Sequence, residues 1–524
     1  MRKWSRYIVG VVTVTGLLVL VAHAGAETCT LELKRVETST GSSSSSSSLA
    51  RIVGSTSSQS FFQQLGGPEG MIIGPGQGDK PDFSDVIKKE PAEYVTKTPF
   101  RGVAELGSQH YGFVLDAAPP SEEEEGKEDE ESKPEDKTQG DQKKPKVEVV
   151  EFARLFFDRN HNGDLTDDEV IEATSSRIYS QTRSRSTFPT AELTIEADGK
   201  KLDYAFRFRV YMNASPDFAY ANASLNSAVY REGEITLDGK KRHVVLVDFN
   251  SNGRFDDASC VDERIRTSNG VVYPRRGDML YIDPEPSAAY RNPYDPTSGR
   301  DQYLVGKLIT IDDRFFNLEV DPSGETLSLE PSPAPVGHVT NPNKGFRAIV
   351  YGDQGMLEIA PDESGKAPLP EGEWKLLSYT ILHPEKPKPA PEPEKTEEAD
   401  KEEKETSILD ALAHVLEAKK PVAKTPPRPR PTLVAARGTQ DYKPVKVVKD
   451  KTVKMPFGPP YTPKVDTPTI RAGQTTVPLS MSLVGIGGEI CSSLRVKGSQ
   501  PSAPEFTIST PDGEEVAAGK FKYG

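Results

Sequence analysis

The tetrapeptide D-G-K-K occurs twice, at residues 198–201 and 238–241, and each copy precedes a stretch with the pattern of a β-strand. After the first copy, apolar residues alternate with polar residues or alanine: Leu202, Tyr204, Phe206, Phe208 and Val210. This period of two predicts a strand with one buried face. After the second copy, the run H-V-V-L-V at 243–247 is β-branched and too short for a helix. Since Asp-Gly between such runs favours a tight turn, both copies predict antiparallel hairpins and a mainly β fold.

A second repeated pattern, D-x-N-x-N-G, stands at residues 158–163 and 248–253. In the first copy, residues that offer oxygen atoms recur through the following stretch: Asp158, Asn160, Asn162, Asp164, Thr166 and Glu169. Hard cations such as Ca²⁺ take about six to eight oxygen ligands from a flexible loop, with glycine at its sharp turn. Gly163 stands at that turn, and Leu165 would anchor the loop to a core. The stretch is therefore predicted to bind Ca²⁺.

With every position filled in register, residues 158–169 resemble the calcium loop of the EF-hand family. The resemblance implies side-chain ligands at Asp158, Asn160 and Asn162, a main-chain ligand at Asp164, a ligand through water at Thr166 and a bidentate carboxylate at Glu169. Because only Asp158 and Glu169 would bring a charge to the ion, we expect weak affinity, suited to the calcium level outside cells. The flanks depart from the family pattern. We expect a strand at 147–157 and a short helix at 167–176, so the loops are expected on a β scaffold.

The second copy, residues 248–259, is reduced. Its candidate ligands are Asp248, Asn250, Asn252, Arg254 at the main-chain position, and Asp256. Ser259 stands where the closing glutamate belongs, and Asp257, Asp262 and Glu263 are candidates to replace it. The alternative is a loop that has lost its metal and is kept as a turn.

The 524-residue chain has only 35% hydrophobic residues, which favours several domains joined by disordered linkers over one core. Residues 86–383 are predicted to form a β-rich domain that carries both loops, with an acidic disordered insertion at 119–146. Residues 27–85 are predicted to be a low-complexity, irregular segment. Residues 384–444 read as a charged, proline-rich linker with a short helix at 407–418. Residues 445–524 are predicted to form a small β-sandwich.

Residues 1–26 combine a basic start, an apolar run and a small-residue end, which is typical of a secretory signal peptide. We therefore expect export to the periplasm, the cell envelope or the extracellular space; an uncleaved anchor is the alternative. No other segment is long and apolar enough to span a membrane. The three cysteines, Cys29, Cys260 and Cys491, permit one disulfide and leave one thiol.

The sequence contains no H-E-x-x-H pair, no G-x-S-x-G elbow and no phosphate-binding P-loop. A net charge of -14 argues against a nucleic-acid partner. The first interpretation is an exported protein with structural calcium and a binding or scaffold role; no catalytic motif is found, and the question of an enzyme stays open. Two alternatives stay open: an exported hydrolase, for example on polysaccharide, with structural calcium, and a calcium-dependent adhesin. The binding partner could be a protein or a polysaccharide, and the sequence does not distinguish between them.

Overall fold

The computed structural model describes residues 25–36, 57–66, 81–119, 149–215, 218–265, 267–284, 301–383, 432–467 and 478–523. These residues form almost only β-strands, arranged in mostly antiparallel sheets, with one short helix, α2 (Phe83–Val86). The predicted mainly β fold is confirmed. Within the described residues, no helix is long and apolar enough to cross a membrane. All three cysteines are free thiols.

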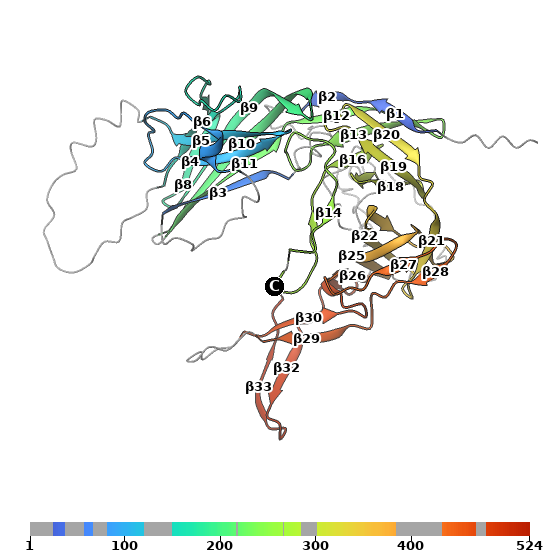
Figure 1. Ribbon diagram of the computed structural model, residues 1–524. Helices are drawn as coiled ribbons and strands as arrows, with labels where there is room; N and C mark the ends of the chain where they lie inside the picture. The colour runs from blue at the N-terminus through green and yellow to red at the C-terminus, as the bar shows by residue number, and fades with distance from the viewer. Residues whose placement is uncertain are drawn as a thin grey trace, which may run out of the picture.

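The first part of the fold is a pair of sheets packed face to face (Figure 1). One sheet has five strands: β3 (Gln59–Gly66), β11 (Ala219–Ser227), β10 (Lys200–Ala214), β9 (Arg183–Ala197) and β8 (Ser175–Ser180). The other has four: β4 (Phe100–Leu106), β5 (Gln109–Ala117), β6 (Phe152–Phe157) and β7 (Ile171–Glu172). Aromatic rings fill the space between them, and Phe113 of β5 lies 4.8 Å from both Phe61 and Phe208 between ring centroids. These contacts hold the two sheets together.

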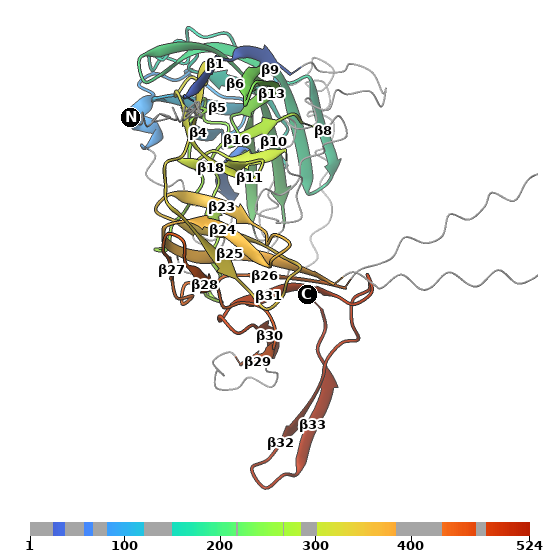
Figure 2. The same cartoon turned by 90° about the vertical axis from the view of Figure 1, so that its right-hand side faces the viewer.

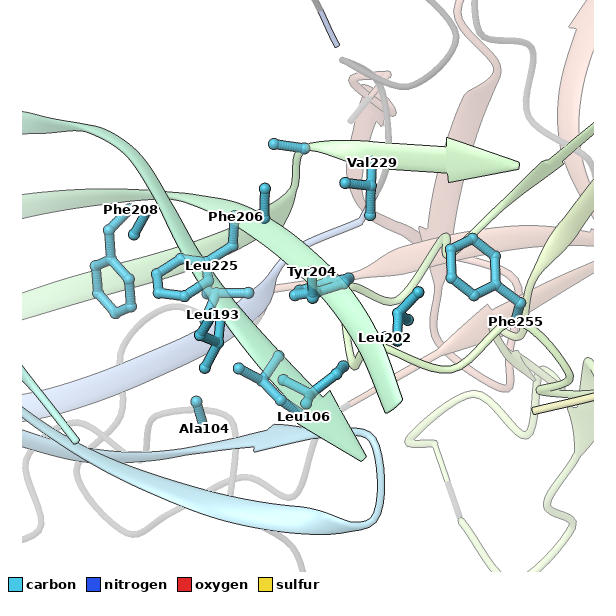
Figure 3. Close-up of a cluster of buried hydrophobic side chains, with 14 of the residues drawn as sticks. Ala104, Leu106, Leu193, Leu202, Tyr204, Phe206, Phe208, Leu225, Val229 and Phe255 are labelled. Carbon is cyan, nitrogen blue, oxygen red and sulfur yellow. The ribbon is translucent and has the colours of Figure 1, made fainter. Parts of the chain in front are cut away.

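The alternating strand predicted at 202–210 is the middle strand of the five-stranded sheet, and its apolar side chains are all buried. Figure 3 shows Leu202, Tyr204, Phe206 and Phe208 in the same cluster as Ala104 and Leu106 of β4. Both predicted hairpins exist as well. Their turn residues have positive φ angles, 47° and 83° at residues 198 and 199 and 50° and 74° at residues 238 and 239. Two successive positive φ angles are what Asp-Gly supplies in a tight hairpin turn.

Two further sheets continue the same core. One has the order β17 (Gln302–Leu304), β16 (Met279–Ile282), β13 (Lys240–Val247), β12 (Val229–Leu237) and β2 (Glu32–Arg35). The other has the order β1 (Glu27–Thr30), β20 (Thr326–Pro331), β19 (Arg314–Val320) and β18 (Leu308–Ile311). The prediction that residues 27–85 are irregular is wrong for β1, β2 and β3, which each extend a sheet. The alternation of Cys29, Leu31 and Leu33 across β1 and β2 is short, and their pairing depends on strands far along the chain.

The last part is a sandwich whose main sheet is built from both sides of residues 384–431. It contains β22 (Phe346–Gly352), β23 (Gly355–Ile359), β25 (Gly372–His383), β26 (Thr432–Arg437), β29 (Thr462–Asp466), β30 (Ser480–Val484) and β31 (Ile490–Arg495), with β27 (Val445–Val447) at one end of β25. Its second sheet has β21 (Val336–Thr340), β24 (Lys366–Pro370) and β28 (Thr452–Lys454). Trp374 and Tyr379 of β25 lie in its core.

Strand β26 pairs with β25 on one side and with β31 on the other. The predicted boundary at residue 383, and the predicted separate domain from residue 445, therefore cut through a single sheet. Strand β26 also falls inside the predicted linker 384–444. The helix predicted at 407–418 lies outside the described residues, as do residues 1–24 and 120–148. A hairpin of β32 (Glu505–Ser509) and β33 (Glu515–Lys520) projects away from the sandwich (Figures 1 and 2).

Candidate metal centre

Each D-x-N-x-N-G loop begins where a buried strand ends. Asp158 follows β6, and Asp248 follows β13, so the two strands predicted before the loops are confirmed. The β4–β5 hairpin contacts both loops: the N–H of Asp158 donates to the carbonyl of Gly112 at 3.1 Å, and the N–H of Gly107 donates to the carbonyl of Asn252 at 2.7 Å. Two segments 90 residues apart in the sequence are thus held by one hairpin.

The two loops have the same internal hydrogen bonds. In each, the carboxylate of the first residue accepts from the N–H groups of the fifth and sixth residues, at 3.0 and 3.0 Å for Asp158 and at 3.1 and 2.8 Å for Asp248. The side-chain oxygen of the fifth residue accepts from the seventh N–H at 2.7 Å in the first loop and 2.9 Å in the second. The sixth residue is glycine with a φ of 78° in the first loop and 76° in the second. The reduced copy therefore keeps the backbone path of the complete one.

The eighth residue anchors each loop, as the sequence predicted for the first. Leu165 and Phe255 are both buried, and Phe255 belongs to the cluster in Figure 3. Their N–H groups each donate at 3.0 Å to a neighbouring segment, that of Leu165 to the carbonyl of Lys89 and that of Phe255 to the carbonyl of Pro322. Neither loop pairs with the other through this position, so each is tied separately to the scaffold.

The tenth residue of each loop is an aspartate that makes the same contacts in both loops, and the sequence pattern did not predict this. Asp167 accepts hydrogen bonds from both Asn side-chain amides of the first loop, at 3.3 and 2.8 Å. Asp257 makes the same two contacts in the second loop, at 3.0 and 2.7 Å. The signal was present, because the tenth position is the one place after the glycine where both copies carry a carboxylate. In both loops a carboxylate therefore faces the two Asn side chains.

A third carboxylate, Asp278, closes the second loop from outside it. Asp278 is fully buried and accepts from the N–H of Phe249 at 3.0 Å and from that of Asp257 at 2.8 Å. It precedes β16, and β16 pairs with β13 so that Met279 is opposite Val247. The antiparallel register places Asp278 next to Asp248, just beyond the paired residues. Like charges at opposed positions are unfavourable unless a cation lies between them.

Burial raises the pKa of both carboxyls. The pKa of Asp248 is raised to about 7 by burial and by the charge of Asp257, even though its carboxylate accepts a hydrogen bond from the hydroxyl of Tyr204 at 2.7 Å. Burial and the charges of Asp248 and Asp257 raise the pKa of Asp278 well above its ordinary value. The basic residue of the loop, Arg254, pairs with Asp198 and Asp256 instead. Buried carboxylates in this state favour either protons or a bound cation.

Each loop also holds a buried oxygen without a hydrogen-bond partner: Asn250 Oδ1 in the second loop and Asp168 Oδ2 in the first. Asp168 accepts a hydrogen bond from the main chain of Arg159, the second residue of its loop, and burial raises its pKa to about 6. Asp278 receives the same contact from Phe249, the second residue of the other loop. Asp168 thus corresponds to Asp278, and an oxygen ligand for a cation is free in each loop.

Several side chains that the sequence predicted as calcium ligands lie away from the carboxylates and asparagines described above. The side chain of Glu169 is 88% exposed and lies 3.9 Å from Arg159. The helix predicted at 167–176 is wrong, because the chain passes from Glu169 into β7, which pairs with β6, and then into β8. The carboxylate of Asp164 pairs with Lys89 at 2.7 Å, and it accepts from the hydroxyl of Thr166 at 2.5 Å.

The other acidic residues predicted as ligands in or near the second loop form ion pairs with basic side chains. Asp256 pairs with Arg254 at 2.9 Å. Of the two more distant candidates for the closing carboxylate, Asp262 pairs with Arg264 and Glu263 pairs with Lys375, each at 2.8 Å. Among the described residues, no three His, Cys, Asp or Glu side chains converge as a formed metal site. A cation here would therefore also need Asn and main-chain oxygens.

A cavity of about 630 Å³ bears on the alternative of a hydrolase. It lies between the segment after the second loop and the C-terminal sandwich, and its lining includes Glu263, Glu373 and Lys375. The Lys375 ammonium lowers the pKa of Glu263, which also accepts a hydrogen bond from Tyr351 at 3.0 Å. A general acid for glycoside hydrolysis needs a raised pKa. Glu263 is held in the opposite state, so it does not suit the role of the general acid.

Comparisons of the chain with protein-family models, with curated proteins and with solved structures found no match.

Proposed function

We propose that this protein binds Ca²⁺ at both D-x-N-x-N-G loops and that the ion has a structural role. The observation that carries the proposal is the second loop, where Asp248 and Asp278 are fully buried beside Asp257 and the oxygen of Asn250 has no partner. A divalent cation would offset the repulsion between these carboxylates and would satisfy the free oxygen. Calcium suits the site because all the available donors are oxygen atoms.

In the first loop, we propose Asp158, Asn160, Asn162, Asp167 and Asp168 as the side chains that hold the ion, with the main-chain carbonyl of Asp164. Thr166 and Glu169 would contribute through water or after a rearrangement. In the second loop the corresponding set is Asp248, Asn250, Asn252, Asp257 and Asp278, with the carbonyl of Arg254. Each set contains three carboxylates, so we expect higher affinity than the two charges counted from the EF-hand resemblance imply.

The role we propose is stabilisation rather than signalling. Each loop joins strands that already belong to sheets, and no helix pair flanks the loops in the described residues. Saturation at about 100 times Kd would add roughly 2.7 kcal/mol per site to the free energy of unfolding. We further propose an exported location, because residues 1–26 have the pattern of a signal peptide.

The experiment is a calcium titration of the chain from residue 27 by calorimetry, with thermal melts in calcium and in chelator. We expect two ions for the parent and one ion for Asp158→Ala and for Asp278→Ala. A matched control is Asp362→Ala, because Asp362 bonds only its own turn through Lys366 N–H and Ser364. No heat and no change in melting temperature for the parent would refute calcium binding. Unchanged stoichiometry in both loop variants would refute the assignment of the sites.

A further inference from the structure

The five-stranded sheet has one face in the core and one face outside it, and five arginines lie on the outer face: Arg177 of β8, Arg183 and Arg185 of β9, and Arg207 and Arg209 of β10. β4, β5 and β6 cover the opposite face (Figure 1). We infer that this outer face, here called the arginine face, binds an acidic polysaccharide with uronate carboxylates. The inference is independent of calcium binding at the loops.

The strand register brings the arginines together. Arg177 is directly opposite Arg185, and Arg185 is directly opposite Tyr211. On the same sheet Arg209 is opposite Thr187, two residue pairs along and therefore on the same face. Like charges directly opposite each other in an antiparallel pair destabilise a sheet. The stability of the fold therefore does not explain why Arg177 and Arg185 are opposite each other. A bound anion would offset the repulsion between them.

Acidic residues are absent from this part of the sheet. The chain has 79 acidic residues and a net charge of -14, yet residues 173–191 and 218–231 contain no Asp or Glu. The acidic residues of β9 and β10 are Glu192, Glu196 and Asp203. They lie toward the 198–199 turn, where Glu192 pairs with Arg35 at 2.6 Å and Asp203 accepts a hydrogen bond from Thr194 at 3.0 Å. Positive charge is thus segregated at one end of a flat surface on an acidic protein. Such a field attracts and orients an anionic partner.

One arginine is already held in position. Arg207 donates to the carbonyl of Val36 at 3.0 Å and to the hydroxyl of Thr190 at 3.4 Å. Burial, and to a smaller extent the charge of Arg209, lower the pKa of Arg207. The other four arginines are exposed. Guanidinium groups bind carboxylates through two parallel hydrogen bonds, so this surface suits carboxylates that repeat along a polymer.

Aromatic and neutral polar side chains complete the face. Phe62 stacks on Tyr220 with ring centroids 5.4 Å apart, and Phe62 is opposite Asn222, which is itself opposite Tyr211. A row across the sheet therefore reads Arg177, Arg185, Tyr211, Asn222 and Phe62. Four strand spacings of about 4.8 Å make this row about 19 Å long. Rings can pack on the C–H faces of sugars, and the amide can bond their hydroxyls, so the row suits an extended glycan.

A membrane surface fits less well. Peripheral membrane binding needs apolar side chains that enter the lipid interface beside the basic residues. On this sheet the large exposed hydrophobic residues are Ile178 and Tyr179, both on the edge strand β8. The middle of the arginine face presents arginine, asparagine, serine and threonine together with half-buried aromatic rings, and no large aliphatic side chain is exposed there among the described residues. This composition favours a hydroxyl-rich anionic polymer over a lipid bilayer.

The test measures binding of the chain from residue 27 to polygalacturonate, with neutral dextran and anionic lipid vesicles as comparison ligands. Chelator is present throughout, so calcium cannot bridge the polymer to the loops. We expect the variant Arg177→Gln, Arg185→Gln, Arg209→Gln to bind at least about tenfold more weakly. The same positions changed to lysine should keep part of the affinity. The matched control, Lys443→Gln, Lys446→Gln, Lys449→Gln, removes three exposed charges from the C-terminal sandwich and should bind like the parent.

The melting temperature of the glutamine variant checks that it folds, and it should equal or exceed that of the parent because a like-charge pair is removed. Equal binding by the glutamine variant and the parent would overturn the proposal. Binding to vesicles without binding to polygalacturonate would overturn it in favour of a membrane. Binding to polygalacturonate that appears only after deletion of residues 119–146 would assign the face to the acidic segment of the same chain, and would overturn it as well.

Discussion

The second loop should bind calcium in competition with protons, over a pH range in which ordinary aspartates are fully ionised. The carboxyl of Asp248 has its pKa raised from 3.8 to about 7. Tyr204, Asp257 and Asp278 are the titratable groups that face it. Burial is the largest cause of the raised pKa; the hydrogen bond from Tyr204 opposes it, and the charge of Asp257 adds to it. A difference of roughly three pKa units corresponds to about 4 kcal/mol between the protonated and ionised states.

The direction of the pH dependence follows from the linkage between proton binding, calcium binding and folding. Calcium binds the ionised carboxylate, so each pH unit below about 7 should weaken binding at least about tenfold, or about 1.4 kcal/mol, through Asp248 alone. Without calcium, the folded pKa of Asp248 lies above its unfolded pKa. Its contribution to stability is therefore fully present below the unfolded pKa and is lost as the pH rises through about 7. Asp278 is shifted in the same direction. The gain in melting temperature from calcium should thus grow between about pH 5 and pH 7.

The assay is calorimetric titration of Asp158→Ala, in which only the second loop binds, in two buffers that differ in ionisation enthalpy. At about pH 6 we expect calcium to release protons from both Asp248 and Asp278, and at about pH 8 to release fewer, because Asp248 is then ionised. Equal affinities at both pH values, with no proton release, would refute the reasoning. That result would mean that Asp248 is ionised in the calcium-free protein, or that it does not bind the ion.

Three further predictions concern single features of the fold. In the first loop, Asp168→Ala should weaken calcium binding more than Glu169→Ala, because Asp168 is bonded to the loop and Glu169 is 88% exposed; calorimetry with the second loop inactivated by Asp278→Ala would contradict this if Glu169→Ala had the larger effect. Gly253→Ala should lower the free energy of unfolding by about 2 kcal/mol, against about 1 kcal/mol for Gly239→Ala. Both glycines have positive φ, but only at Gly253 would a Cβ overlap Ile195. Equal losses in denaturant unfolding would contradict that explanation. Replacing residues 119–146 by a short Gly-Ser linker should keep one cooperative melt, because Ala117 and Phe152 on either side are paired neighbours in β5 and β6; a broad or lost transition would show that the segment stabilises the core.

The parts of the fold that the sequence predicted are those with a local signal. The Asp-Gly turns and the alternation after residue 201 specify their hairpins within about thirty residues. The parts that it missed depend on partners far along the chain. Strand β1 pairs with β20 across about 300 residues, and β26 joins β25 and β31 across the segment 384–431. Short strands of this kind carry little periodicity, so their pairing is decided by tertiary contacts.

The candidate site also has residues that a local sequence signal predicts and residues that only tertiary contacts bring in. The first, third, fifth and sixth positions of each loop follow from spacing alone, and their shared hydrogen bonds account for that regularity. Asp278 stands thirty residues after Asp248, and nothing in the sequence around it marks it as part of a loop. It reaches the second loop because β16 pairs with β13. A register between two strands is a tertiary property, and the ligand is therefore visible only once the sheet is known.

The pairing of β13 with β16 also limits the structural effect that bound calcium can have. In a helical frame, an ion bound by such a loop can change the angle between two helices. Here Asp248 and Asp278 stand at adjacent ends of β13 and β16, whose backbones are already joined by hydrogen bonds. An ion between them could draw the two ends together but could not swing either strand without breaking the sheet. The proposed calcium effect is therefore graded stabilisation of the sheet end, strongest at neutral pH, where the buried carboxylates most need a cation.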